Sequence, residues 1–172
     1  MADNRPLIIG ADYGNSYGFA VLDGVECLDS GVFKLKAGAW AKLSWGRWWL
    51  LRRYLTQLVT ETREKHPKRE IVCAFEGVKR HTSTASAHVW GGMHAHTELV
   101  MGDLDVPLIE VNVGVWKKLV CGAGNASKTE YTEIIGSRYA REMPDDEAAA
   151  IGIGLGVYYR DYWEKDAISS VD

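Results

Sequence analysis

The sequence is poor in cysteine, and its three cysteines, Cys27, Cys73 and Cys121, lie far apart. An odd number of widely spaced cysteines favours reduced thiols and argues against a disulfide framework or a zinc site. The sequence has no apolar run of the ~18 residues that a membrane helix needs, and residues 1–6 lack the apolar core of a secretion signal. We therefore expect a cytoplasmic protein that has no membrane partner.

The sequence also lacks an excess of positive charge, because its formal net charge is −3. This balance argues against broad, non-specific binding of nucleic acid by a uniformly basic surface. It leaves room for a local basic patch beside an acidic site. No linker rich in proline, glycine or serine and no internal repeat interrupts the 172 residues, of which 47% are hydrophobic. We therefore predict a single domain, residues 1–172, with a sizeable core.

Two short apolar runs each end in a carboxylate. Residues 7–12 form the first run, which ends at Asp12 and is followed by a turn at residues 14–16. Residues 71–75 form the second run, and Glu76 follows it. Continuous apolar runs of this length predict strands that are buried on both faces. A carboxylate at the end of such a strand either caps the turn or meets a cation, and the run alone leaves both open.

The other segments predict a mixed α/β fold. Residues 17–22, 25–35 and 106–111 read as further strands, and residues 42–65 and 85–101 read as long helices. Residues 115–120 predict a short helix or turn, and residues 127–141 a helix that starts with a capping box. A last helix should open at residue 144. A five-stranded sheet in the order 3-2-1-4-5, flanked by helices, would place Asp12 and Glu76 within a few ångströms of each other.

A third acidic group, formed by Asp145, Asp146 and Glu147, opens the predicted last helix. Acidic residues in a first turn also complement the helix dipole, so each acid alone could have a structural role. Gathered carboxylates repel one another unless a cation neutralises them, and hard oxygen ligands suit Mg²⁺ or Mn²⁺. Two such ions about 3.5–4 Å apart can activate water and stabilise the leaving oxygen of a phosphodiester. The combination indicates metal-assisted phosphodiester hydrolysis.

Basic residues accompany the acids. Lys128 stands in the first turn of a predicted helix, after a glycine-containing loop, where backbone N–H groups favour a phosphate. Lys117 and Lys118 precede that loop, and Lys79 and Arg80 follow Glu76. These five residues are candidates for holding a DNA backbone, although most lysines are simply solvated. Residues 122–129 miss the P-loop pattern, because Ser127 stands where that motif needs glycine.

Tryptophans gather near the start of the first long helix, at Trp40, Trp45, Trp48 and Trp49. Such side chains stack on bases or fill a core or a subunit interface. Core or interface is favoured, because only Arg47 lies among them. Gly91 and Gly92 in the second long helix predict close packing against another helix, either in this chain or in a second copy of it.

Four segments resemble the RuvC family of Holliday-junction resolvases, which have an RNase H-like fold. Residues 9–14 with Gly18 resemble its first motif, and Phe75-Glu76 its second. The third, residues 116–128, resembles its lysine-G-x-G-x-A-x-K segment. Residues 146–152 resemble its D-x-A-D-A motif, except that Ala149 replaces the second aspartate. The match spans roughly residues 7–158, and the chain is similar to phage or bacterial members.

The resemblance implies specific roles for these residues. Asp12, Glu76 and Asp146 would be catalytic carboxylates that bind Mg²⁺, for which Mn²⁺ could substitute, while Lys117 and Lys128 would contact the scissile phosphate. The fourth carboxylate would come from Asp145 or Glu147, or be absent. The expected protein is a homodimer that nicks four-way DNA junctions in the cytoplasm of a bacterium or of a phage-infected host, with residues 85–101 as its interface. Two alternatives stay open: a protein that binds branched DNA with weak or lost cleavage, and a nucleotide-binding relative of the sugar kinases.

Overall fold

The computed structural model describes residues 5–14, 16–35, 42–43, 45–78 and 83–163. Lys79, Arg80 and Trp40, which the sequence marked as candidates, lie outside the described residues. Within these ranges the strands form one five-stranded sheet in the order β3-β2-β1-β4-β5. This order is the one that the sequence predicted.

The central strand of the sheet is β1 (Leu7–Tyr13). It pairs antiparallel with β2 (Tyr17–Asp23) and parallel with β4 (Ile71–Gly77). At the two edges, β3 (Glu26–Phe33) continues the antiparallel meander and β5 (Leu108–Asn112) pairs parallel with β4. The mixed α/β prediction is therefore confirmed.

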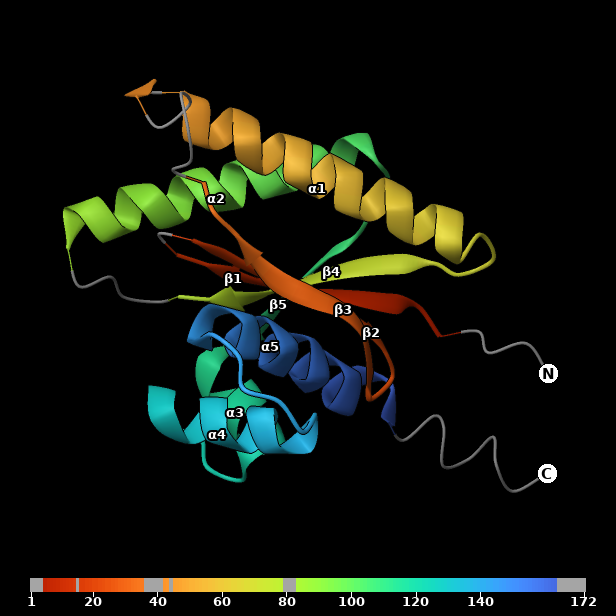
Figure 1. Ribbon diagram of the computed structural model, residues 1–172, viewed down its shortest axis with the longest axis vertical. Coiled ribbons are helices and arrows are strands. Elements are labelled where there is room, and N and C mark those ends of the chain that lie inside the picture. Colours follow the sequence, from red (N-terminus) through yellow and green to blue (C-terminus); the bar gives the residue numbers. More distant parts are fainter. Residues whose placement is uncertain (1–4, 15, 36–41, 44, 79–82, 164–172) are drawn as a thin grey trace.

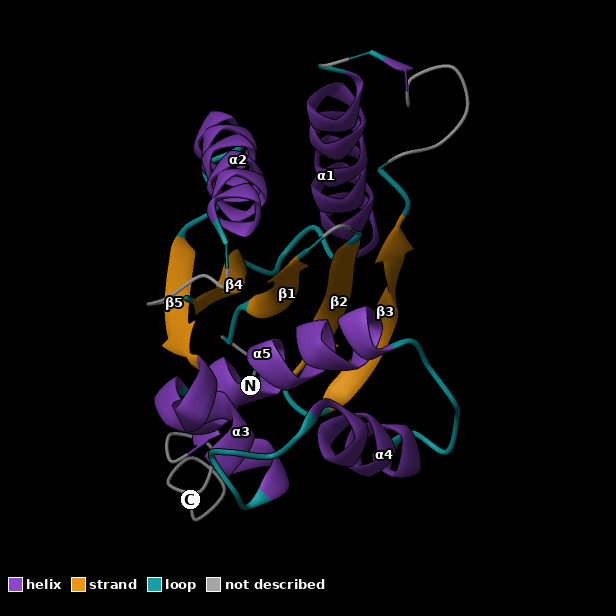
Figure 2. Ribbon diagram, turned by 90° about the vertical axis from the view of Figure 1, so that its left-hand side faces the viewer, coloured by secondary structure: helices purple, strands orange, loops and turns teal. Residues whose placement is uncertain are grey.

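Helices cover both faces of this sheet (Figures 1 and 2). One face carries α1 (Gly46–Lys65) and α2 (Thr84–Asp103). The other carries α3 (Val113–Cys121), α4 (Lys128–Arg138) and α5 (Asp145–Asp161), with α5 lying directly on the strands. Each layer has its own buried apolar cluster, so the sheet separates two halves of the core. No helix in the described part of the chain is long and apolar enough to cross a membrane.

Glycines bring α5 unusually close to the sheet. A Cβ atom on Gly10 of β1 would overlap the backbone carbonyl oxygen of Ala150. A Cβ atom on Gly18 of β2 would overlap the carbonyl oxygen of Asp146 in the same way. Because a methyl group cannot share space with a backbone oxygen, only glycine fits at either position. These contacts set the start of α5 over the end of β1.

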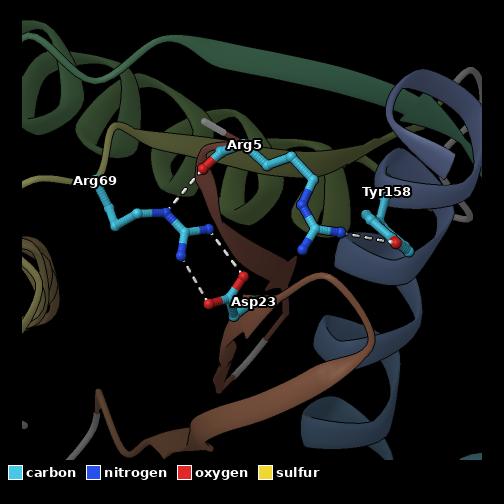
Figure 3. Close-up of polar contacts among 4 residues, drawn as sticks. All are labelled: Arg5, Asp23, Arg69 and Tyr158. Atoms are coloured by element: carbon cyan, nitrogen blue, oxygen red, sulfur yellow. Dashed lines mark hydrogen bonds and ion pairs between the residues drawn. The ribbon is translucent and has the colours of Figure 1, made fainter. Parts of the chain in front are cut away.

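A polar network ties the opposite end of the sheet together (Figure 3). Both guanidinium N–H arms of Arg69 donate to the carboxylate of Asp23, each over 2.8 Å. The Nε of Arg69 donates to the backbone oxygen of Arg5, and the Arg5 guanidinium donates to the Tyr158 hydroxyl. The bidentate pair thus joins the end of β2 to the start of β4, and the two bonds of Arg5 connect the start of β1 to Arg69 and to the end of α5.

The helix ends differ most from the prediction in two places, at the start of α1 and at the end of α4. Helix α1 begins at Gly46, four residues after the predicted start. Helix α4 ends at Arg138 and not at residue 141, because Ala140 adopts a left-handed conformation with φ 53°. The backbone N–H of Arg141 then bonds to the oxygen of Gly136, and that of Ala140 to Ser137, which closes the helix with a Schellman motif.

The tryptophans on α1 have divided roles. Trp48 stacks on His96 of α2 with ring centroids 5.3 Å apart, and its ring fills the space above Gly92. The predicted close packing at Gly92 is thus an intramolecular contact between α1 and α2. Gly91 faces open space. Trp45 and Trp49 remain 51% and 39% exposed, so these two side chains lie at the surface and not in the core.

Candidate active site

Two acids end adjacent parallel strands on the same face of the sheet. Ala11 pairs with Phe75 in the register of β1 and β4, so Asp12 and Glu76 each lie one residue further on. Alternation along a strand turns both side chains toward the face that carries α5, the same face as Gly10. The predicted juxtaposition of Asp12 and Glu76 therefore follows from the observed register.

The start of α5 adds a second pair of acids. Asp145 and Asp146 occupy the first turn of α5, where the partial positive charge of the helix N-terminus favours carboxylates. Both act electrostatically on Asp12. The close approach at Gly18 explains this proximity, since the backbone of Asp146 lies directly against β2 beside Asp12. Four carboxylates from three elements thus converge on one region.

The crowding of negative charge shows in the protonation of these acids. Burial raises the pKa of Asp12 from 3.8 to about 7, and the charges of Glu76, Asp146 and Asp145 add to the effect. Burial also raises the pKa of Glu76. For Asp146, burial and the neighbouring Asp145 together raise the pKa. The cluster therefore carries negative charge that its own basic neighbours do not fully offset, which is the condition that favours a bound cation.

Lys128 is the basic residue most directly engaged with the acids. Its ammonium forms an ion pair with the carboxylate of Asp145, and this interaction raises the pKa of Lys128. The side chain of Ser127 accepts from the N–H of Glu130, whose carboxylate in turn accepts from the N–H of Ser127. This predicted capping box fixes the first turn of α4, and with it the position of Lys128.

The other candidate lysines lie on α3. Lys117 donates from Nζ to the backbone oxygen of Ala126 over 2.8 Å. Its charge lowers the pKa of Glu76, against the larger effect of burial, so it lies near the acids. Lys118 is exposed, and no contact among the described residues connects it with the acidic cluster. The structure thus brings Lys117 and Lys128 to the acids and leaves Lys118 at the surface.

Two residues of the D-x-A-D-A-like segment turn away from the acids. Glu147 is buried. It forms an ion pair with Arg141 over 2.7 Å and accepts a hydrogen bond from Ser30 over 2.8 Å. Ala149 is 3% exposed and packs in the apolar cluster under α5. Of the two residues that could replace the missing aspartate, only Asp145 therefore lies beside Asp12.

Sequence reasoning missed two aromatic residues at the site. The indole Nε1 of Trp116 donates to Oε2 of Glu76 over 2.8 Å. The phenol of Tyr131 has its pKa raised by burial and then by the charge of Asp12, which places it beside the same acids. Both residues look like ordinary core positions in the sequence, because only the fold shows which polar atom an aromatic side chain presents.

The donors of this site suit a hard divalent cation, since they are carboxylate oxygens with raised pKa values. These carboxylates do not form a metal coordination shell in this structure. Among the described residues, no three acidic, histidine or cysteine side chains lie close enough together to hold one ion. Asp145 is engaged by Lys128, and Glu76 by Trp116. Asp12, Glu76, Asp145 and Asp146 are the residues that would hold such a cation.

Comparison with solved structures identifies the fold. The structure of Thermus thermophilus RuvC matches with a TM-score of 0.72 at 17% sequence identity, over 90% of this chain and 95% of that one. The structure of T. thermophilus RuvC in complex with a Holliday junction substrate matches with a TM-score of 0.74, also at 17% identity, over 91% and 95%. No protein-family model and no curated protein matches the sequence. The chain therefore has the RNase H-like fold of RuvC, as its motifs predicted.

Proposed function

We propose that this protein is a metal-dependent endonuclease that resolves Holliday junctions or other branched DNA by paired nicks. The observation that carries the proposal is the meeting of four carboxylates, Asp12, Glu76, Asp145 and Asp146, at one end of a RuvC-like sheet. Their shared negative charge and raised pKa values fit binding of Mg²⁺, for which Mn²⁺ would substitute. When bound, such ions supply an activated water and stabilise the leaving oxygen.

The residues of the chain have distinct parts in this reaction. Asp12, Glu76 and Asp146, with Asp145 as the fourth acid, hold the metal ions. Lys128 exchanges its partner Asp145 for the scissile phosphate, to which it presents a point charge. Lys117 holds the loop that leads to Lys128, through its bond to Ala126. The products carry 5′-phosphate and 3′-hydroxyl ends.

Branched DNA is the substrate that the comparison favours, since one of the similar RuvC structures is a complex with a Holliday junction. Lys117, Lys118 and Lys128, together with Lys79 and Arg80 outside the described residues, would contact the phosphate backbone. Such contacts position a duplex without reading its sequence. A net charge of −3 agrees with this local arrangement, because the acids of the site offset the basic residues around it.

A homodimer would supply two such sites for the two nicks. Helix α2 is our candidate interface, because Leu99 on it is 53% exposed and Gly91 faces open space. A second copy could approach the backbone closely at Gly91. Light scattering of the wild type and of Leu99→Glu tests this assignment: the variant should have the mass of one chain. A wild type with the mass of one chain would contradict the dimer.

The decisive assay is nicking of a synthetic four-way junction with and without Mg²⁺. Wild type should cleave only with the metal, and Asp12→Asn should lose activity by at least about 10³-fold, since the acid at the centre of the cluster is gone. Asp103→Asn is the matched control, because Asp103 is an exposed acid whose carboxylate pairs with Arg52 of α1. Cleavage by Asp12→Asn at the wild-type rate would overturn the proposal.

One observation favours a second candidate function, binding of branched DNA with weak or lost cleavage. Ala149 stands where the resemblance expects an aspartate, and its side chain is packed in the core. Junction binding in an electrophoretic shift, without nicks in either Mg²⁺ or Mn²⁺, would establish this second function and refute the first.

A further inference from the structure

Trp116 is the largest fully buried side chain of the protein's described residues. The residue is 1% exposed and packs against α5, with its ring on Gly152 and its Cβ and Cα atoms on Gly156. A Cβ atom on Gly152 or on Gly156 would overlap the Trp116 side chain. Gly156 therefore lets the base of the side chain approach α5, and Gly152 leaves the space that the indole ring occupies.

The orientation of the ring directs the single hydrogen-bond donor of the indole at an acid of the site. Nε1 of Trp116 donates to Oε2 of Glu76 over 2.8 Å. The donor is rigid because the ring is wedged against α5, whereas Glu76 has a flexible side chain at the end of β4. The bond thus transfers the rigidity of the α3–α5 contact to one carboxylate oxygen.

The same indole also contacts the basic side of the site. The ring of Tyr131 meets that of Trp116 edge-on, with centroids 5.4 Å apart. The ammonium of Lys117 lies 5.0 Å from the Tyr131 ring centroid and 5.7 Å from that of Trp116. Trp116 therefore contacts both Glu76 and the lysine that holds the loop before Lys128.

We propose that Trp116 is a positioning residue that acts through Glu76 and holds its carboxylate ready for a divalent cation. The inference rests on the proposed metal-dependent function. Partners that orient a metal ligand from behind typically change metal affinity or activity 10–100-fold when they are lost. A tryptophan that only fills the core would have no such specific effect on metal binding.

The test is Mn²⁺ binding measured by titration calorimetry, with Trp116→Phe as the main variant. Phenylalanine keeps a Cβ atom against Gly156 and an aromatic ring facing Gly152, and it removes the N–H donor. We expect affinity for Mn²⁺ to fall about tenfold. Trp48→Phe is the matched control, because Trp48 packs on Gly92 on the other face of the sheet; its affinity should equal that of the wild type.

A double-mutant cycle shows whether Trp116 acts through Glu76. In a Glu76→Gln background, adding Trp116→Phe should leave Mn²⁺ affinity unchanged, because the carboxylate that the indole orients is already gone. Junction affinity in EDTA should be the same for Trp116→Phe and the wild type. An equal loss in both backgrounds, or no loss in either, would overturn the proposal.

An NMR measurement on the wild type covers the case in which Trp116→Phe does not fold. The indole N–H of Trp116 should give a resonance that moves downfield relative to the same resonance in Glu76→Gln, since a hydrogen bond to a charged oxygen deshields the proton. It should move again when Mg²⁺ is added. A Trp116 resonance that is unaffected by Mg²⁺ would refute the inference, whereas a wild type that binds no metal at all would refute the proposed function instead.

Discussion

Asp12→Asn is expected to stabilise the metal-free protein, and more so as the pH rises. The pKa of Asp12 is raised from 3.8 to about 7 by burial and by the acids around it. The folded state therefore keeps this proton when the unfolded chain has lost it. The stability that the proton confers is complete below pH 3.8 and is lost as the pH rises through 7. Asparagine has no proton to lose, so it retains that stability throughout.

The size of the effect follows from the shift. One pKa unit corresponds to about 1.4 kcal/mol, so the full shift of Asp12 is worth about 4 kcal/mol. At pH 5 the unfolded chain has already released the proton, so the wild type has lost about 1.6 kcal/mol of the stability that the proton confers. At pH 8 the wild type has lost nearly all of this stability, which is about 4 kcal/mol. Asp12→Asn should therefore exceed the wild type by about 1.6 kcal/mol at pH 5 and by about 4 kcal/mol at pH 8.

Urea unfolding in EDTA at the two pH values measures this difference. Asp103→Asn, at an exposed site, should change the free energy of unfolding by less than about 0.5 kcal/mol at either pH. Adding Mg²⁺ at pH 8 should stabilise the wild type and not Asp12→Asn, because a bound cation neutralises the cluster. The reasoning fails if Asp12→Asn is no more stable than the wild type at pH 8, or gains the same amount at pH 5.

Three further variants test the arrangement. Gly10→Ala should lower the free energy of unfolding by 3 kcal/mol or more in urea unfolding, about the upper range for point variants, because its methyl group meets the backbone of α5. Arg141→Met should lower the free energy of unfolding by about 3 kcal/mol in the same assay, because Glu147 is then buried without its ion pair. Junction binding should be unchanged. A loss under about 0.5 kcal/mol would contradict the role of the buried pair. Lys128→Met should slow junction nicking at least about 10²-fold while Mn²⁺ binding tightens, since Asp145 loses a competing cation; unchanged nicking would remove Lys128 from the reaction.

The strands themselves were predictable because apolar runs and turn residues are local signals. The runs that end at Asp12 and Glu76 predicted the two central strands, and the capping box at Ser127 predicted where α4 begins. The end of α4 was not predictable, because Ala140 is a rare residue for the left-handed conformation that closes the helix. The alanine side chain does not indicate from the sequence that the backbone at residue 140 adopts the left-handed conformation.

Part of the candidate site was also visible in the sequence. Asp12 and Glu76 could be named because carboxylates at the ends of buried strands are costly unless they find a partner. Asp146, Lys117 and Lys128 were assigned through the resemblance of their segments to the RuvC motifs. Their roles in binding metal and phosphate stay predictions. The same reasoning included Lys118, which the structure leaves at the surface.

What the sequence determined by itself is the order of the elements and the acids at their ends, since both depend on neighbours along the chain. Only the tertiary structure decided which acid of the last helix faces Asp12, because one turn of α5 directs Asp145 and Glu147 to different partners. It also decided that Trp116 holds Glu76. These two residues are forty positions apart in the chain, and no local pattern encodes a hydrogen bond that exists only when α3 packs against α5.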